Sequence, residues 1–166
     1  MSDNTHTVFL ALGSNLGDKT RMLSLALEQI ATHGGKIIKT SSIYETSPWG
    51  FNHEESFYNL VTKIETTLTP SELLHQLLQI ETQLGRIRNS SEGYAARTID
   101  IDILFFDNII LTENSLTIPH PHIEKRLFVL VPLNEIAPEF VHPISQKTIQ
   151  TILTNCEDKG EVKRVE

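Results

Sequence analysis

The sequence predicts a single α+β domain in which an antiparallel sheet is packed against helices. Three observations point to this class: apolar runs of strand length, two segments with apolar residues at helical spacing, and turn-forming residues between them. The chain has 166 residues, of which 39% are hydrophobic and 21% charged, which suits one domain spanning residues 1–166. We expect its charged tail, residues 157–166, to be poorly ordered.

The predicted elements follow the order strand, helix, strand, strand, helix, strand. Apolar runs predict the strands at residues 7–12, 37–44, 57–66 and 98–106. Asp18 is the predicted N-cap of the first helix, which Gly34 ends. Thr69 and Glu72 form a capping box that opens the second helix, and Gly85 follows its end. A hairpin and two short helices then follow, at residues 109–118, 129–137 and 148–153. This order is that of the ferredoxin-like fold, with helices on one face of the sheet, plus a C-terminal extension.

The composition restricts the possible partners. The net charge is −7, so the chain as a whole does not attract nucleic acid. The N-terminus MSDNTH lacks the regions of a signal peptide, and no apolar run approaches the roughly 20 residues that span a bilayer. The single cysteine, Cys156, cannot form an internal disulfide, which suits a reducing compartment. We expect a cytoplasmic protein, acting as a monomer, that binds neither nucleic acid nor membrane.

Two aspartates on the last predicted strand are the first candidate site. Because strand side chains alternate, Asp100 and Asp102 share one face, about 6–7 Å apart, while neighbours such as Ile103 and Phe105 face the core. Two carboxylates so close repel each other unless a cation lies between them. Magnesium takes one or two carboxylates together with substrate phosphates. A solvated strand face with incidental acids is the alternative interpretation of this short pattern.

Three arginines lie close to this strand in the sequence. Arg86 and Arg88 precede a segment of Asn, Ser, Gly and Ala residues, and Arg97 follows it. Arginine suits polyphosphate because its planar fork bonds two oxygens at once, and such a segment can close over a substrate. No Walker A sequence is present, so metal and arginine would have to hold the phosphates. Each arginine alone would be read as an ordinary surface residue.

Aromatic and amide side chains suggest a place for a flat heterocycle. The set comprises Thr46, Pro48, Trp49, Phe57, Asn59 and Phe128. Asn59 is unusual because Asn is depleted in strands; for the aromatics, core packing is the competing interpretation. In the segment after Pro119, His120 is a candidate donor to phosphate or ribose, with Arg126 near it in the sequence.

Taken in order, these segments resemble the 6-hydroxymethyl-7,8-dihydropterin pyrophosphokinases of folate biosynthesis. The blocks that carry the resemblance are residues 11–15 (ALGSN), 44–48 (YETSP), 57–59 (FYN), 81–88 (with Glu81, Gly85, Arg86 and Arg88), 96–102 (ARTIDID), 119–120 (PH) and 131–133 (VPL). The resemblance implies transfer of the β,γ-diphosphate of ATP to the hydroxymethyl group of the reduced pterin, with release of AMP.

The resemblance also implies residue roles. Asp100 and Asp102 would hold two Mg²⁺ ions on the triphosphate, and Arg86 and Arg97 would engage the phosphates during transfer. The positions implied to contact ATP are Glu81, Arg88, Ile103, Thr117, His120 and Arg126. The positions implied to form the pterin pocket are Thr46, Ser47, Trp49, Phe57, Asn59, Tyr94 and Phe128.

Two other functions fit parts of the sequence. Paired aspartates on a ferredoxin-like sheet also occur in nucleotidyltransferases, which release pyrophosphate. The same fold serves in modules that bind single-stranded RNA, although these favour aromatic residues on the open sheet and a basic surface.

Overall fold

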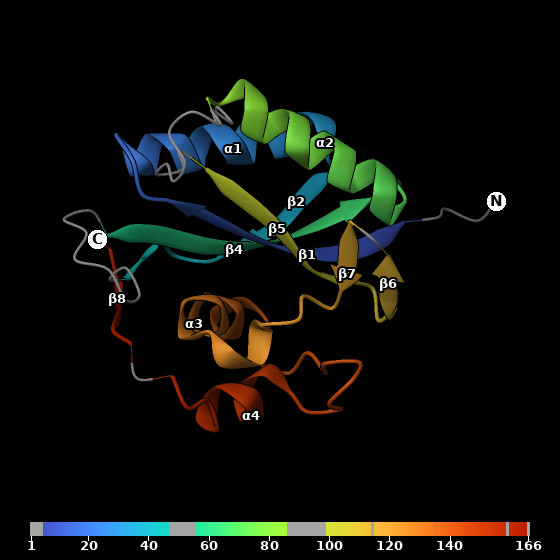
Figure 1. Cartoon of the computed structure of the whole chain (residues 1–166), viewed down its shortest axis with the longest axis vertical. Coiled ribbons are helices and arrows are strands. Elements are labelled where there is room, and N and C mark those ends of the chain that lie inside the picture. Colours follow the sequence, from blue (N-terminus) through green and yellow to red (C-terminus); the bar gives the residue numbers. More distant parts are fainter. Residues whose placement is uncertain (1–4, 47–55, 86–98, 114, 159, 166) are drawn as a thin grey trace.

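The computed structural model describes residues 5–46, 56–85, 99–113, 115–158 and 160–165 (Figure 1). The strands are β1 (His6–Ser14), β2 (Lys36–Thr40), β3 (Tyr44–Thr46), β4 (Phe57–Thr66), β5 (Asp100–Phe106), β6 (Leu111–Glu113), β7 (Leu116–Ile118) and β8 (Val162–Arg164). The helices are α1 (Lys19–His33), α2 (Pro70–Gln83), α3 (Leu127–Ile136) and α4 (Ile149–Thr154), with a 3-10 turn, η2, at Ile123–Lys125. None of these helices is long and apolar enough to cross a membrane, as judged over the described residues.

The strands form an antiparallel sheet whose order confirms the predicted fold class. Its path is β5-β1-β4-β3-β8, and β2 also pairs with β4. Strand β4 therefore lies between β1 and β2, and β1 lies between β4 and β5. Both β-α-β units are split in this way, as the ferredoxin-like arrangement requires. Strands β6 and β7 form a separate hairpin.

Helices α1 and α2 cover one face of the sheet, and their starts are set by the predicted caps. The Asp18 side chain accepts a hydrogen bond from the Arg21 N–H. Thr69 and Glu72 form both hydrogen bonds of the capping box. Gly85 follows α2 with a φ of 102°, a left-handed conformation that favours glycine. The apolar faces of both helices pack on Leu10, Leu12 and Ile101 of the sheet, among others.

The other face of the sheet is also covered, which differs from the expected single layer of helices. Helices α3 and α4 pack beneath it, so the sheet lies between two helical layers (Figure 1). The physical reason is that the central strands are apolar on both faces. In β1, Leu10 packs toward α1 and α2, whereas Phe9 packs with Val61 and Leu130 on the α3 side. The C-terminal extension is therefore required to complete the core.

Three local differences from the sequence prediction have clear causes. The strand expected at residues 37–44 is split, because the Ser41 side chain accepts the Val61 N–H in place of a backbone carbonyl. Phe105 faces α3 rather than the side of Ile103, because a bulge shifts the register of β5 against β1. The tail expected to be poorly ordered forms β8, which pairs with β3.

Candidate active site

The two aspartates lie on the α3 side of the sheet, in the N-terminal part of β5, which begins at Asp100. In the ladder with β1, Asp100 is opposite Gly13 and Asp102 is opposite Ala11. Opposite residues of an antiparallel pair point to the same face, and Ala11 packs with the α3 cluster. Asp100 is half-buried and Asp102 is exposed. The pair therefore shares one accessible face, with a Cα separation of about 6.5 Å.

A buried carboxylate fixes the backbone between these two aspartates. The Oε2 atom of Glu81, in the last turn of α2, accepts the N–H of Ile101 at 2.7 Å. The side chain of Glu81 is buried at 3% exposure. Strand β5 lies at the end of the sheet path, so this carboxylate engages a backbone group that no strand among the described residues pairs. No pattern in the sequence indicates this contact, because it depends on how α2 packs against β5.

A second group of polar residues lies across the sheet from the aspartates. The Asn59 amide Nδ2 donates to Thr46 Oγ1 at 3.1 Å, and both residues are 7% exposed. Asn59 is opposite Gly13 in β1, which in turn is opposite Asp100 in β5. Two strand spacings therefore separate Asn59 from Asp100, about 10 Å. Phe57 is opposite Thr46 at the same end of β4.

Gly13 lies on β1 between Asn59 and Asp100, and packing of the Asn59 amide requires that this residue has no side chain. A Cβ atom at this position would lie 2.7 Å from the Asn59 Oδ1 atom. The glycine therefore permits the Asn59 amide to lie over β1 and leaves the sheet open between Asn59 and Asp100. Asn15, just beyond this strand, is buried at 2% exposure, and its Oδ1 has no hydrogen-bond partner in the described structure. The sequence indicates both residues only as members of the 11–15 block that carries the resemblance, without a role of their own.

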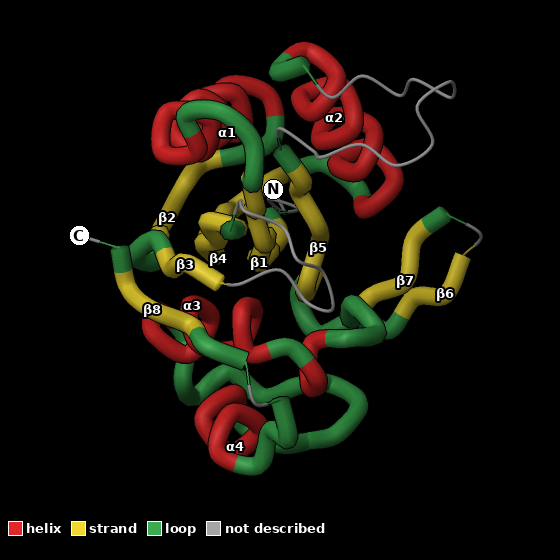
Figure 2. Tube along the Cα trace, turned by 60° about the vertical axis from the view of Figure 1, so that its left-hand side comes forward, coloured by secondary structure: helices red, strands yellow, loops and turns green. Residues whose placement is uncertain are grey.

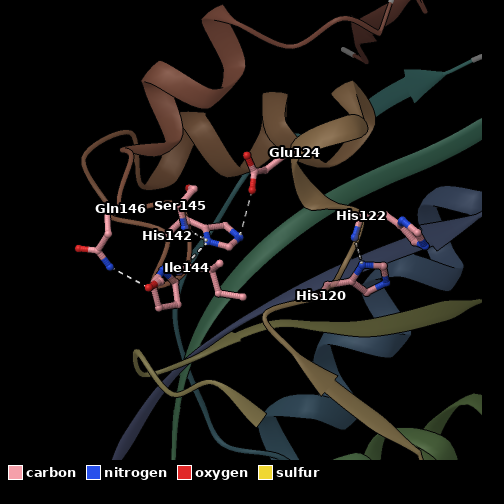
Figure 3. A network of polar contacts seen from close by, with 8 residues as sticks. His120, His122, Glu124, His142, Ile144, Ser145 and Gln146 are labelled. Atoms are coloured by element: carbon pink, nitrogen blue, oxygen red, sulfur yellow. Dashed lines mark hydrogen bonds and ion pairs between the residues drawn. The ribbon is translucent and has the colours of Figure 1, made fainter. Parts of the chain in front are cut away.

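His120 follows the β6–β7 hairpin and is fixed against β5 by its backbone. Its N–H donates to the Leu104 carbonyl at 3.0 Å, and its Nδ1 accepts the N–H of His122 at 3.2 Å (Figure 3). Burial, followed by the charges of Arg126 and His122, lowers the pKa of His120 to about 4. The ring is therefore neutral near pH 7. With Nδ1 acting as acceptor, the proton is assigned to Nε2, which can donate to a ligand oxygen.

Arg126 and Phe128 flank the first residue of α3. The Arg126 guanidinium carbon lies 5.5 Å from the centre of the Phe128 ring, a cation–π contact. Both side chains are half-buried, and Phe128 packs against the apolar cluster beneath the sheet. The start of α3 therefore brings one cationic and one aromatic group to the aspartate face of the sheet.

Two further predicted residues are Ile103 and Thr117, and seven lie outside the described residues. The Ile103 side chain is buried at 4% exposure on the α1–α2 side, so only its backbone can reach a ligand on the aspartate face. Thr117 is exposed in β7. The predicted residues outside the described ranges are Ser47, Pro48, Trp49, Arg86, Arg88, Tyr94 and Arg97.

A second histidine network lies apart from this site (Figure 3). The Nδ1 atom of His142 accepts the N–H groups of Ile144 and Ser145, and its Nε2 lies 3.9 Å from Glu124. Burial lowers the pKa of His142, and the nearby Glu124 charge opposes this shift. These bonds stabilise the loop before α4, and none of the predicted site residues takes part in them.

The donor set of the aspartate face fits magnesium. Within the described ranges, no group of three or more His, Cys, Asp or Glu residues is placed to hold a metal. Two neighbouring carboxylates remain, which is the protein contribution that Mg²⁺ uses when waters and substrate phosphates complete its octahedron. A zinc-type site would require more nitrogen or sulfur ligands.

Comparison with known proteins decides the family. The sequence model described as 7,8-dihydro-6-hydroxymethylpterin-pyrophosphokinase (HPPK) matches residues 9–138. The chain belongs to this family. A 2-amino-4-hydroxy-6-hydroxymethyldihydropteridine pyrophosphokinase of Methylorubrum extorquens is 42% identical over 159 residues, covering 95% of this chain and 98% of the relative. A relative from Aquifex aeolicus with the same name is 40% identical, covering 87% and 88%.

Longer proteins contain the same unit. The folic acid synthesis protein fol1 of Pneumocystis carinii is 39% identical over 95% of this chain, which spans only 21% of that relative. The crystal structure of Plasmodium falciparum HPPK-DHPS with pteroate superposes with a TM-score of 0.76 at 19% identity, covering 93% of this chain and 45% of that one. At that identity the superposition supports the fold alone.

Membership of the HPPK family makes the chain a pyrophosphokinase of folate biosynthesis, and ATP is the co-substrate that the family implies. The nucleotidyltransferase and RNA-binding interpretations of the sequence are thereby set aside.

Proposed function

We propose that the chain transfers the β,γ-diphosphate of ATP to the hydroxymethyl oxygen of 6-hydroxymethyl-7,8-dihydropterin, giving the pterin diphosphate and AMP. The observation that carries this proposal is the shared face of Asp100 and Asn59, separated by Gly13 alone. One end of this face offers carboxylates for metal-bound phosphates, and the other offers an amide for the edge of a heterocycle. Because Gly13 has no side chain between these two ends, the hydroxymethyl group could point from the amide end toward the phosphates.

On the phosphate side, Asp100 and Asp102 would hold two Mg²⁺ ions. The metal, when bound, neutralises phosphate charge and lowers the pKa of the accepting hydroxyl. His120 would donate from Nε2 to a phosphate or ribose oxygen, and Arg126 would add positive charge beside it. Arg86 and Arg97, assigned by resemblance, would stabilise the charge that develops on the transferred group. Glu81 would keep the two aspartates in position through the Ile101 N–H. The other ATP contacts assigned by resemblance are Arg88, Ile103 and Thr117.

On the pterin side, Asn59 would read the polar edge of the ring. Its bond to Thr46 fixes the orientation of the amide, so the amide is prepared before the substrate arrives. Phe57 and Phe128 would contact the faces of the ring. Ser47, Trp49 and Tyr94 complete this set by resemblance.

The test is a product assay with the purified protein, ATP, Mg²⁺ and the reduced pterin. Chromatography should resolve AMP and the pterin diphosphate in equal amounts. Formation of ADP would show transfer of a single phosphoryl group, and formation of inorganic pyrophosphate would show nucleotidyl transfer. Either result would refute the proposal.

A matched pair of variants tests the role of the carboxylates. Asp102→Asn should lower kcat by about 100-fold or more, since metal-assisted charge stabilisation contributes several kcal/mol. Asp107→Asn is the control, because Asp107 follows the other end of β5 and bonds His6 and Thr7 there. Its φ of 50° suits asparagine, so this variant should fold and keep its activity. Equal activities of the two variants would contradict the assigned role.

We also propose that one copy of the chain suffices for this reaction, in the cytoplasm. All of the residues assigned above come from a single chain. Sedimentation of the active protein should therefore give the mass of a monomer, and activity per mole should not depend on protein concentration.

A further inference from the structure

The C-terminal tail contacts the start of α3, between two predicted site residues. The Oδ2 atom of Asp158 accepts the N–H of Leu127 at 3.1 Å, and Leu127 is the first residue of α3. Its neighbours are Arg126 and Phe128. The N-cap residue Arg126 makes no capping hydrogen bond with its own side chain, and the first turn of α3 contains no acidic residue. The cap of this helix is therefore supplied from 31 residues further along the chain.

Asp158 is itself held in place. Its Oδ1 atom accepts the N–H of Gly160 at 2.8 Å, so its two oxygens have separate partners. This second bond limits the rotation of the carboxylate and directs Oδ2 toward α3. A negative group at this position also suits the positive end of a helix dipole.

The same tail continues along β3, which ends in Thr46. In the β3–β8 ladder, Thr46 is opposite Val162 and Tyr44 is opposite Arg164. The N–H of Val165 extends the ladder by donating to the Ile43 carbonyl at 2.8 Å. Figure 2 shows β8 running beside β3 and next to α3, and α3 is in contact with both strands.

We propose that Asp158 and residues 160–165 position both sides of the pterin pocket, with Asp158 as a positioning residue for Arg126 and Phe128. This inference rests on the proposed function, because it assigns Phe128 and Thr46 to the pterin. Strand β3 has only three residues. Without β8 it would be a short edge strand, free on one side, directly at the residue that orients Asn59. Without Asp158, the first turn of α3 would lose its cap beside the cationic and aromatic groups.

A helix cap can contribute to stability alone, so the test must distinguish an effect on the positions of Arg126 and Phe128 from an effect on the stability of the protein. Thr148→Ala is the matched control: Thr148 caps α4 through the N–H of Thr151 at 3.2 Å, and no predicted site residue lies on α4. Both Asp158→Ala and Thr148→Ala should lower Tm by a similar amount. Only Asp158→Ala should raise KM for the pterin, by about fivefold, the factor that corresponds to a lost cap of ~1 kcal/mol. Asp158→Asn keeps an acceptor oxygen and should restore most of the wild-type KM.

Amide hydrogen exchange provides a readout that is independent of catalysis. The Leu127 amide should exchange faster in Asp158→Ala than in the wild type and should be unchanged in Thr148→Ala. Faster exchange with an unchanged KM would overturn the positioning role, and unchanged exchange would overturn the cap itself. If the wild-type protein formed no pterin diphosphate, the proposed function would fail instead, and the exchange experiment would still report on the cap.

Discussion

Gly13→Ala should damage the Asn59 end of the site more than it damages the fold. The added Cβ would lie 2.7 Å from Asn59 Oδ1, whereas ordinary contact begins at 3.4 Å, so the amide must move by about 0.7 Å. Gly13 and Thr46 lie on the two strands that flank β4, so the amide is pushed toward Thr46 and their 3.1 Å bond can no longer keep its geometry. Loss of that bond costs about 1 kcal/mol. The reduced entropy of the unfolded chain offsets roughly 0.4–1 kcal/mol of this.

The expected result is therefore a protein of nearly wild-type stability with a KM for the pterin raised about fivefold or more, the equivalent of ~1 kcal/mol, and a smaller change in KM for ATP. Steady-state kinetics with each substrate varied in turn, together with Tm, would measure this. Gly17→Ala is the control, since Gly17 has a φ of 68° and no atom of the described residues lies within 4 Å of the added Cβ. Backbone strain should destabilise this variant by about 1 kcal/mol and leave both KM values unchanged. An unchanged KM for the pterin in Gly13→Ala would refute the proposed placement of the substrate over this glycine.

Three further predictions concern groups that support the site. Glu81→Ala should lower the free energy of unfolding in urea by about 2 kcal/mol, because it leaves the buried N–H of Ile101 without an acceptor; an unchanged midpoint would contradict this. Burial, then the hydrogen bond and charge of Glu135, raise the pKa of Tyr44 to about 12. Glu135→Gln should lower that pKa toward 10, as measured by an absorbance titration. A shift in the opposite direction would be inconsistent with the bond. The pKa of His120 lies near 4, below its unfolded value of 6.5, so the unfolded chain binds the proton first and the stability due to this group is lost as pH falls from 6.5 to 4. In His120→Gln the loss of stability between pH 6.5 and 4 should be smaller than in the wild type. NMR of the wild-type protein should show no titration of His120 near pH 6.5.

The parts of the fold that the sequence predicts well are those with local causes. Strand β4 has the predicted bounds, and α2 begins at the predicted capping box, since both depend on residues within one turn or one strand. The inversion of Phe105 was not predictable, because the bulge arises from the pairing of β5 with β1. The β8 strand was missed for a related reason: a short charged segment becomes a strand only when an unpaired edge lies beside it.

The candidate site, like the fold, has features that one segment predicts and features that depend on how distant segments pack. Alternation along a single strand is enough to bring Asp100 and Asp102 to one face. The distance from Asp100 to Asn59 depends on the register of three strands, and the bond from Glu81 to Ile101 depends on how a helix meets a strand. No residue pattern within one segment contains this information, which is why the steric role of Gly13 and the bond from Glu81 to the Ile101 N–H were found only in the structure.

Strand β5 ends the sheet, and its outer edge is the kind of surface to which another chain can add a strand. On this edge, Glu81 occupies the N–H of Ile101 and the backbone of His120 occupies the carbonyl of Leu104. A second molecule would have to displace both before it could pair there. The groups that hold the aspartates and the histidine in place therefore also protect the protein from strand-to-strand aggregation. Variants that remove either of these two contacts should for that reason be examined for solubility as well as for activity.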